Sequence, residues 1–306
     1  LYGGDYNPEQ WMSENGADEN PIWQEDLRLM HKAGVNLVNL GIFSWSSLQP
    51  AEGIFTFEWL DRILDLLAEQ RIFVALGTGT AAQPAWLSET YPDVLPVNEL
   101  GLRRTHGRRL NYCPTNPHFR RLAHALVNEL AKRYDDHPAL LLWHVSNEYG
   151  PTCFCTNCAA QFRLWLQRQY GSLKELNQRW VTSFWSHTYT SWEQIQPPNA
   201  LGENSIQALL LDYQRFMSDA NLACYQGEAA ILRELTPHIP VFTNLHGLQK
   251  SLDYFSWAPH QDIIAWDSYP HHDTHPSTTA FYFDLMRGLG EGKPWLLLEQ
   301  APGQVQ

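Results

Sequence analysis

Two hydrophobic patterns alternate along the chain. Short, near-continuous apolar runs predict buried β-strands, and stretches with apolar residues three or four positions apart predict amphipathic helices. The predicted strands occupy residues 1–6, 35–40, 72–76, 140–145, 241–244, 263–267 and 295–299. The predicted helices occupy residues 22–32, 60–69, 117–134, 159–170, 205–235 and 278–288.

This alternation indicates the fold class. Apolar strands separated by helices are typical of a parallel sheet that is covered by helices. No glycine-rich phosphate-binding loop follows the first strand, which disfavours an open nucleotide-binding sheet. The pattern therefore predicts an α/β fold, a (β/α)8 TIM barrel, in which residues 1–306 form one domain and supply seven of the strands. We expect the eighth strand to lie beyond Gln306.

Two connections are long enough to suggest a function. Residues 77–116 follow the third predicted strand, and residues 150–204 follow the fourth. Both lie at the C-terminal face, where barrel enzymes build their sites, and loops beyond about 15 residues are usually functional. We expect residues 150–204 to form an inserted, cysteine-containing loop and helix region.

Composition narrows the partners. The chain has 306 residues, is 44% hydrophobic and carries a formal charge of -12. Nucleic acids and anionic membranes attract clustered Lys and Arg, so this acidic balance argues against both. The sequence contains no run of about 18 apolar residues, the length that a membrane-spanning helix needs. The 13 Trp, 13 Tyr and 13 Phe suit either a sugar ligand or an aromatic core.

Carboxylates end two of the apolar strands. The fourth strand ends in Asn147-Glu148, and the seventh ends in Glu299-Gln300. Asn and Glu are poor strand residues, so their place at the mouth of a barrel indicates a site. Glycoside hydrolysis needs two carboxyl groups that flank the scissile bond, and retaining enzymes hold them roughly 5–5.5 Å apart. The competing interpretation is a pair of solvated or ion-paired structural carboxylates.

Several motifs together carry a resemblance to a known family. They lie at residues 3–11, 41–45, 50–57, 109–113, 143–150, 267–270 and 299–302. With these motifs the chain resembles the β-galactosidases of glycoside hydrolase family 42. The resemblance implies a retaining mechanism, with Glu148 as the acid/base and Glu299 as the nucleophile. It also implies a galactoside or oligosaccharide substrate, no organic cofactor and a homotrimeric full-length protein.

The resemblance also implies substrate-binding residues. Arg109 and Asn147 match family positions that bind the galactose hydroxyls. Tyr269, at the end of the sixth predicted strand, is expected near the nucleophile. Trp185 matches a family aromatic residue that lines the sugar site, although Trp180 and Trp192 are close in sequence.

Four cysteines form a second candidate site. Cys153, Cys155 and Cys158 follow the proton donor closely, and Cys113 lies on the preceding long connection. Four thiolates would close a tetrahedral zinc site with no open position, which predicts a structural role. Two disulfide bridges compete with this interpretation, although cysteines two positions apart rarely bridge each other. Several members of the family have a four-cysteine zinc site here, and reduced thiols would suggest a cytoplasmic protein.

Other functions remain open at this stage. A β-glucosidase, β-mannosidase, mannanase or α-L-arabinopyranosidase would share the same two Glu on the same barrel. A non-catalytic carbohydrate-binding barrel would be expected to have lost one of them, and both are present. A zinc oxidoreductase is disfavoured because no dinucleotide-binding glycine motif is present.

Overall fold

The computed structural model describes residues 1–12 and 20–300, so the motif residues Ala301 and Pro302 lie outside it. Its strands are all parallel to their neighbours and form two sheets. The first sheet contains, in order, β1 (Gly3–Tyr6), β2 (Leu37–Leu40), β3 (Phe73–Gly77), β4 (Leu140–His144) and β5 (Val241–Phe242). The second contains β6 (Asn244–His246), β7 (Ile264–Ser268) and β8 (Trp295–Gln300).

All seven predicted strands are confirmed, but the fifth is divided into β5 and β6 at Thr243. The backbone N–H of Thr243 donates to Oε1 of Gln261 at 3.0 Å, a side chain rather than a neighbouring strand. The chain therefore pairs with β4 before Thr243 and with β7 after it. Because neighbouring strands are parallel in both sheets, the carboxyl ends of the strands of each sheet lie at the same edge of that sheet.

All six predicted helices are confirmed within a few residues at their ends. They are α1 (Pro21–Ala33), α3 (Glu58–Glu69), α5 (Pro117–Tyr134), α6 (Thr156–Tyr170), α8 (Gln207–Leu235) and α10 (Pro276–Leu289). The caps show why two of them begin where they do. The side chain of Asn20 accepts from the backbone of α1, Asn116 does the same for α5, and Pro occupies the first turn of each.

Shorter helices lie within the connections and were not predicted. The α-helices among them are α2 (Trp45–Leu48), α4 (Ala85–Thr90), α7 (Leu173–Trp180) and α9 (Tyr254–Trp257). The 3-10 turns are η1 (Pro8–Trp11), η2 (Pro92–Val94), η3 (Phe184–Ser186), η4 (Trp192–Gln194) and η5 (Ala258–His260).

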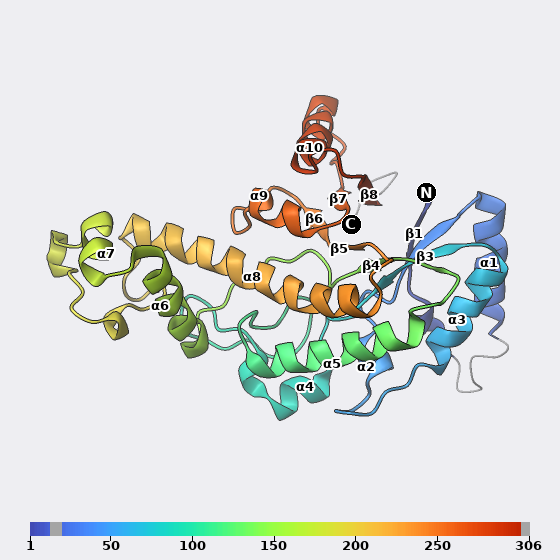
Figure 1. The fold of residues 1–306 in the computed structure, drawn as a ribbon, viewed down its shortest axis with the longest axis horizontal. Helices are drawn as coiled ribbons and strands as arrows, with labels where there is room; N and C mark the ends of the chain where they lie inside the picture. Colours follow the sequence, from blue (N-terminus) through green and yellow to red (C-terminus); the bar gives the residue numbers. More distant parts are fainter. Residues whose placement is uncertain (13–19, 301–306) are drawn as a thin grey trace.

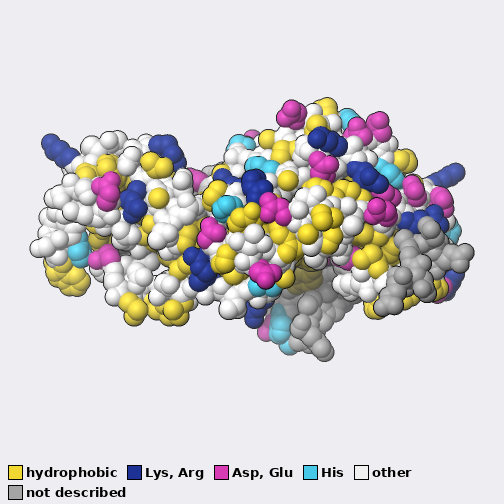
Figure 2. All heavy atoms as spheres, turned by 90° about the horizontal axis from the view of Figure 1, so that it is seen from below, with side chains coloured by type: hydrophobic (Ala, Val, Ile, Leu, Met, Phe, Trp, Pro, Cys, Tyr) yellow, Lys and Arg dark blue, Asp and Glu magenta, His cyan; other side chains and the backbone are white. Residues whose placement is uncertain are grey.

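The molecule is elongated, with the strands toward one end and α6 and α7 at the other (Figure 1). We call α6, α7, η3, η4 and the N-terminal half of α8 the helical lobe. The long helix α8 runs from this lobe to the strands (Figure 1). Figure 2 shows the lobe and the rest of the chain as two bulges, with acidic and basic side chains interspersed over the visible face.

Each bulge has its own hydrophobic core. The core of the strand-bearing part includes Trp45, Trp143 and Trp266, each 0–1% exposed. The core of the lobe includes Phe162, Leu176 and the cysteines at 113, 153, 155 and 158. Among the residues that the structure describes, no helix is both long and apolar enough to cross a membrane.

A fully buried carboxyl group joins α8 to the sheet. Oε2 of Glu228 accepts hydrogen bonds from the hydroxyls of Thr78, at 3.0 Å, and Thr80, at 2.8 Å. The hydroxyl of Tyr149 donates to Oε1 at 3.4 Å. Burial raises the pKa of Glu228 to about 7, and these hydrogen bonds oppose that rise.

We expect Glu228→Gln to become more stable relative to wild type as the pH rises. Because the pKa of Glu228 is raised in the folded protein, folding favours the protonated form. Wild-type stability is therefore fully present below about pH 4.5 and falls as the pH rises through about 7. The loss is about 3 kcal/mol, which the uncharged Gln variant avoids. Melting temperatures of wild type and Glu228→Gln at pH 5 and pH 8 measure this difference in stability.

Glu234→Gln, at an exposed position of the same helix, is the matched control. It should change the melting temperature by a similar small amount at both pH values. A Glu228→Gln variant whose difference from wild type were the same at pH 5 and pH 8 would contradict the buried, ionisable role of this carboxyl.

Candidate active site

Glu148 lies on a turn directly after β4 with an unusual backbone. Ser146 and Glu148 adopt left-handed conformations, with φ of 55° and 45°. Such a backbone costs of order 1 kcal/mol or more at a residue other than glycine and persists only where surrounding contacts hold it. Here the N–H of Ser146 donates to Oγ1 of Thr78 at 2.9 Å, and that of Glu148 donates to Oδ1 of Asn244 at 2.8 Å. Two side chains thus hold the turn that carries Glu148.

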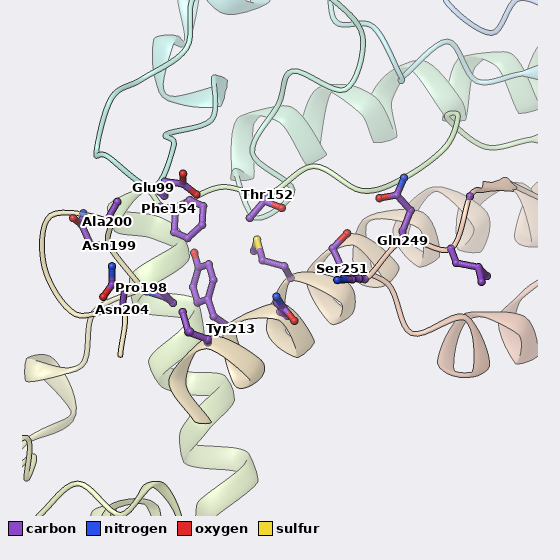
Figure 3. Close-up of a pocket in the computed structure, with 16 residues that line it drawn as sticks. Glu99, Thr152, Phe154, Pro198, Asn199, Ala200, Asn204, Tyr213, Gln249 and Ser251 are labelled. Atoms are coloured by element: carbon purple, nitrogen blue, oxygen red, sulfur yellow. The ribbon is translucent and has the colours of Figure 1, made fainter. Parts of the chain in front are cut away.

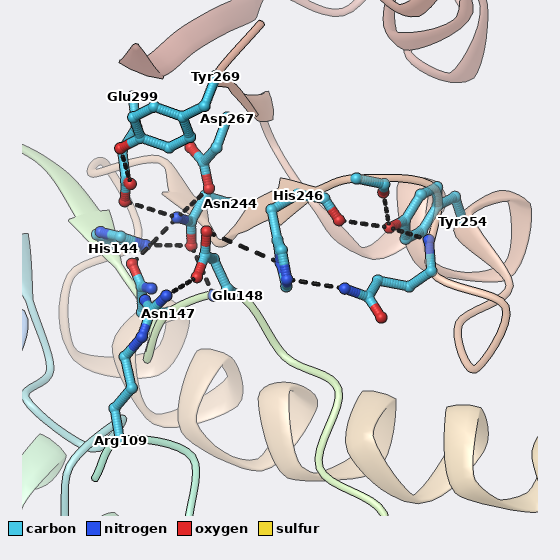
Figure 4. A network of polar contacts seen from close by, with 12 residues as sticks. Arg109, His144, Asn147, Glu148, Asn244, His246, Tyr254, Asp267, Tyr269 and Glu299 are labelled. Atoms are coloured by element: carbon cyan, nitrogen blue, oxygen red, sulfur yellow. Dashed lines mark hydrogen bonds and ion pairs between the residues drawn. The ribbon is translucent and has the colours of Figure 1, made fainter. Parts of the chain in front are cut away.

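Asn244, the first residue of β6, lies at the centre of the site (Figure 4). Its Nδ2 lies 2.6 Å from Oδ2 of Asp267, 3.0 Å from Oδ1 of Asn147 and 3.1 Å from Oε1 of Glu299. Sequence reasoning missed Asn244. The signal was the same one that identified Glu148, a polar residue at the end of an apolar strand, but here the polar residue is an uncharged amide.

Glu299 lies on β8 and is held from two sides. The hydroxyl of Tyr269, just after β7, donates to Oε2 at 2.6 Å, and Asn244 donates to Oε1. Burial raises the pKa of Glu299 to about 7, the Tyr269 hydrogen bond opposes that rise, and the charges of Asp5 and Glu148 add to it. The hydrogen bond from Tyr269 therefore favours the ionised form of Glu299, while burial favours the protonated form.

A third carboxyl group shares this space. Asp267, on β7, is 3% exposed. Carboxylate oxygens of Glu148, Asp267 and Glu299, which we call the carboxyl trio, all lie within 4.8 Å of one another. Retaining glycosidases separate their two carboxyl groups by about 5–5.5 Å, and inverting enzymes by about 6.5–9.5 Å. The spacing of Glu148 and Glu299 fits the first class.

Arg109 supplies positive charge to the site. Its Nη2 lies 2.5 Å from Oε2 of Glu148, and its guanidinium lies over the ring of Phe43, 5.8 Å from the centroid. On the other side, Nδ1 of His246 is 3.9 Å from Oε1 of Glu148 (Figure 4). Burial lowers the pKa of His246, so its imidazole is mainly neutral at neutral pH. Glu148, 5% exposed, thus faces one cation and one neutral base.

Trp185 does not join this cluster within the chain. It lies on η3, which follows α7 at the end of the molecule far from the strands (Figure 1). Its side chain is 70% exposed and stacks on Phe184, with ring centroids 5.0 Å apart. The structure therefore brings together Glu148, Glu299 and three of the four predicted substrate-binding residues, and it places Trp185 on the surface of the helical lobe.

A cavity of about 750 Å³ lies between the helical lobe and the segment after β6 (Figure 3). Its lining includes Thr152, Phe154 and Tyr213 on one side and Gln249 on the other. None of the carboxyl trio is among the described lining residues. Nε2 of Gln249 lies 2.8 Å from Nε2 of His246, so one hydrogen-bonded side chain connects the cavity to the residue beside Glu148.

The four predicted cysteines form one buried cluster. Their sulfur atoms lie within 4.8 Å of one another. Sγ of Cys113 is 3.4 Å from that of Cys158 and 3.7 Å from that of Cys155. A tetrahedral zinc with Zn–S bonds of about 2.3 Å places its sulfurs about 3.8 Å apart, so the cluster has the size of a metal site. All four are free cysteines, and the competing arrangement of two disulfides is not seen in the described part of the chain.

The comparisons with known proteins agree on one family. A family model described as beta-galactosidase, of glycoside hydrolase family 42, matches residues 5–306. Beta-galactosidase BgaP of Planococcus sp. (strain L4) is 48% identical over 99% of this chain and 45% of its own length. Beta-galactosidase bgaB of Geobacillus kaustophilus is 48% identical over 100% of this chain and 45% of its own length.

Solved structures show the same relationship. The beta-galactosidase from Bacillus circulans sp. alkalophilus has a TM-score of 0.94 at 46% identity, covering 98% of this chain and 44% of that one. A catalytic mutant of Gan42B, a GH42 beta-galactosidase from G. stearothermophilus, has a TM-score of 0.93 at 44% identity, over 99% and 45%. The chain thus spans less than half the length of these relatives. It has their TIM-barrel fold and belongs to glycoside hydrolase family 42, the beta-galactosidase family.

Proposed function

We propose that the protein is a retaining β-galactosidase that hydrolyses terminal β-D-galactosides through a covalent galactosyl-enzyme intermediate. One observation carries this proposal. Carboxylate oxygens of Glu148 and Glu299 lie within 4.8 Å of each other at the ends of two barrel strands. Family membership agrees with it. The upper limit of 4.8 Å is nearer to the about 5–5.5 Å separation of a retaining site than to the about 6.5–9.5 Å of an inverting one.

The surroundings of Glu299 suit a nucleophile. Hydrogen bonds from Tyr269 and Asn244 hold its two oxygens in place. Glu299 attacks the anomeric carbon while Glu148 gives its proton to the leaving oxygen. Glu148 then removes a proton from the water that releases the sugar. Because the pKa of Glu299 is raised to about 7, activity should rise with pH as this group ionises.

Arg109 and Asn147 are proposed to bind the galactose hydroxyls. Both lie within the carboxyl-lined space, Arg109 against Glu148 and Asn147 against Asn244. The galactoside preference over glucosides, mannosides or arabinosides is proposed because the similar proteins are beta-galactosidases.

The cavity beside the site supports an oligosaccharide substrate. The leaving group departs on the side of the acid/base, and the cavity lies on that side. Gln249 in its lining contacts His246, which faces Glu148. Its volume of about 750 Å³ and its mix of aromatic and amide side chains suit further sugar units.

The cysteine cluster is proposed to hold a structural zinc ion. Four buried sulfurs at this spacing saturate a tetrahedral ion, which leaves no open position for catalysis. Cys113 belongs to the connection after β3, and the other three belong to the connection after β4. A bound ion would therefore join the two long connections that flank Glu148.

Assembly into a homotrimer is proposed from the family. The exposed apolar side chains of Val181, Phe184 and Trp185 support it, because apolar groups gathered on a surface commonly mark an interface. Since Trp185 lies far from the carboxyl trio of its own chain, any contact it makes with a sugar would be in the site of another copy.

Glu299→Ala should lower kcat of the full-length enzyme on a 4-nitrophenyl β-galactoside by at least about a thousandfold, because the covalent intermediate cannot form. Azide should restore turnover and give a product of inverted configuration. Initial rates and product NMR measure this, and a panel of 4-nitrophenyl glycosides identifies the preferred sugar. Glu234→Ala, an exposed change, is the control. A variant that kept its rate would remove Glu299 from the mechanism.

Cys155→Ser should abolish a stoichiometry of about one zinc per chain and lower the melting temperature, because three thiolates hold the ion less tightly than four. Metal analysis and thermal unfolding measure this. The matched control is Cys224→Ser, which removes a buried thiol on α8 outside the cluster and should keep the metal. Protein that contains no metal, or whose melting temperature does not change when the metal is removed, would contradict the structural zinc.

A further inference from the structure

The carboxyl trio contains more acceptors than nearby donors can serve. The amide of Asn244 has two protons, and three oxygens lie within 3.1 Å of its nitrogen, those of Asn147, Asp267 and Glu299. At least one of these three oxygens therefore receives no N–H proton from Asn244, or shares one with another oxygen. The shortest of the three, at 2.6 Å, is with Oδ2 of Asp267. A proton on one of the carboxyl groups would supply the missing donor.

The charges around the trio lead to the same conclusion. The titratable groups that face it come from β1, the connection after β3, β4, β6, the turn after β7 and α9, namely Asp5, Arg109, His144, His246, Tyr269 and Tyr254. Burial lowers the pKa of His144 to about 4, so this imidazole is neutral near pH 7. Arg109 remains as the cation that the structure places against the trio. Three carboxylates this close together, two of them buried and the third partly buried, cannot all stay ionised beside one guanidinium.

Asp267 is the member least able to hold a negative charge. Glu148 has the guanidinium of Arg109, and Glu299 has the hydroxyl of Tyr269 as well as the amide of Asn244. Asp267 has only its share of the Asn244 amide, and its Oδ1 is buried without a hydrogen-bond partner among the described residues. Burial, with the charges of Glu299 and Glu148, raises the pKa of Asp267 to about 10.

We propose that Asp267 is a positioning residue that holds a proton of its own, separate from the one that Glu148 gives to the leaving group, and donates it in a hydrogen bond to a neighbouring carboxylate. This inference rests on the proposed glycosidase function for its kinetic consequence, though not for the proton itself. A neutral Asp267 lies beside the two catalytic groups without adding a negative charge of its own. Glu299 can then ionise next to an acid instead of next to an anion.

The kinetic test compares two Asp→Asn substitutions near the same nucleophile, in the full-length enzyme. Asp267→Asn replaces one neutral donor with another, so the acidic limb of the pH profile of kcat/KM should stay within about 0.2 pH unit of wild type. Asp5→Asn removes a charge that raises the pKa of Glu299, so its acidic limb should move to lower pH. Asp267→Ala, which removes the hydrogen bond, should lower kcat/KM by about ten- to a hundredfold.

An Asp267→Asn profile that moved to lower pH as far as that of Asp5→Asn would overturn the proposal, because it would show that a negative charge had been lost. Infrared difference spectra of wild type and Asp267→Asn test the proton without any turnover. At pH 8.5, where Glu228 and Glu299 with pKa values of about 7 are ionised, the carbonyl stretch of a neutral carboxylic acid should be present in wild type and absent in the variant. A difference spectrum at this pH that lacks the band would also overturn the proposal. If wild type hydrolysed no glycoside, the proposed function would fail while this spectral test still decided the proton.

Discussion

The arrangement of the site depends on the side chain of Asn244. Its oxygen accepts from the backbone of Glu148, and its nitrogen faces Asn147, Asp267 and Glu299. One amide thereby sets the relative positions of the acid Glu148, the nucleophile Glu299 and Asn147, a proposed sugar-binding residue. A planar group of this kind fixes angles as well as distances, because its donor and acceptor directions cannot rotate independently. The division of the fifth barrel strand at Thr243 directly precedes this residue, so an irregularity of the sheet occurs where the site needs a side chain aimed inward.

Sequence reasoning found what periodicity and strand ends reveal. It gave the bounds of α5 correctly, since Asn116 and Pro117 mark the start of that helix, and it found Glu148 and Glu299 as charged residues after apolar strands. It missed α7, a short and mainly polar helix that is held by the packing of Leu176 and Trp180. Asp267 was seen only as part of a motif, because nothing local shows that a strand-borne carboxyl will be buried beside two others. Which strand ends meet depends on contacts between residues far apart in sequence.

The left-handed turn that carries Glu148 is held by Thr78 as well as by Asn244 of the site. Thr78 accepts from the backbone of Ser146, and its hydroxyl donates to Glu228 on α8. The acid is therefore connected through two side chains to a helix outside the barrel. A buried carboxyl that looks unrelated to the chemistry thus helps to hold the backbone strain on which the direction of the Glu148 side chain depends.

The helix α8 belongs to both hydrophobic cores. Its N-terminal half packs Leu209, Tyr213 and Phe216 into the core of the lobe, and its C-terminal half packs Tyr225 and Leu232 into the core of the strand-bearing part. Because helix formation is cooperative along its length, neither core can come apart without disturbing a helix that the other needs. The inserted lobe is therefore not an appendage that could be gained or lost on its own. It and the barrel form a single cooperative unit of folding, and sequence change in one is constrained by the other.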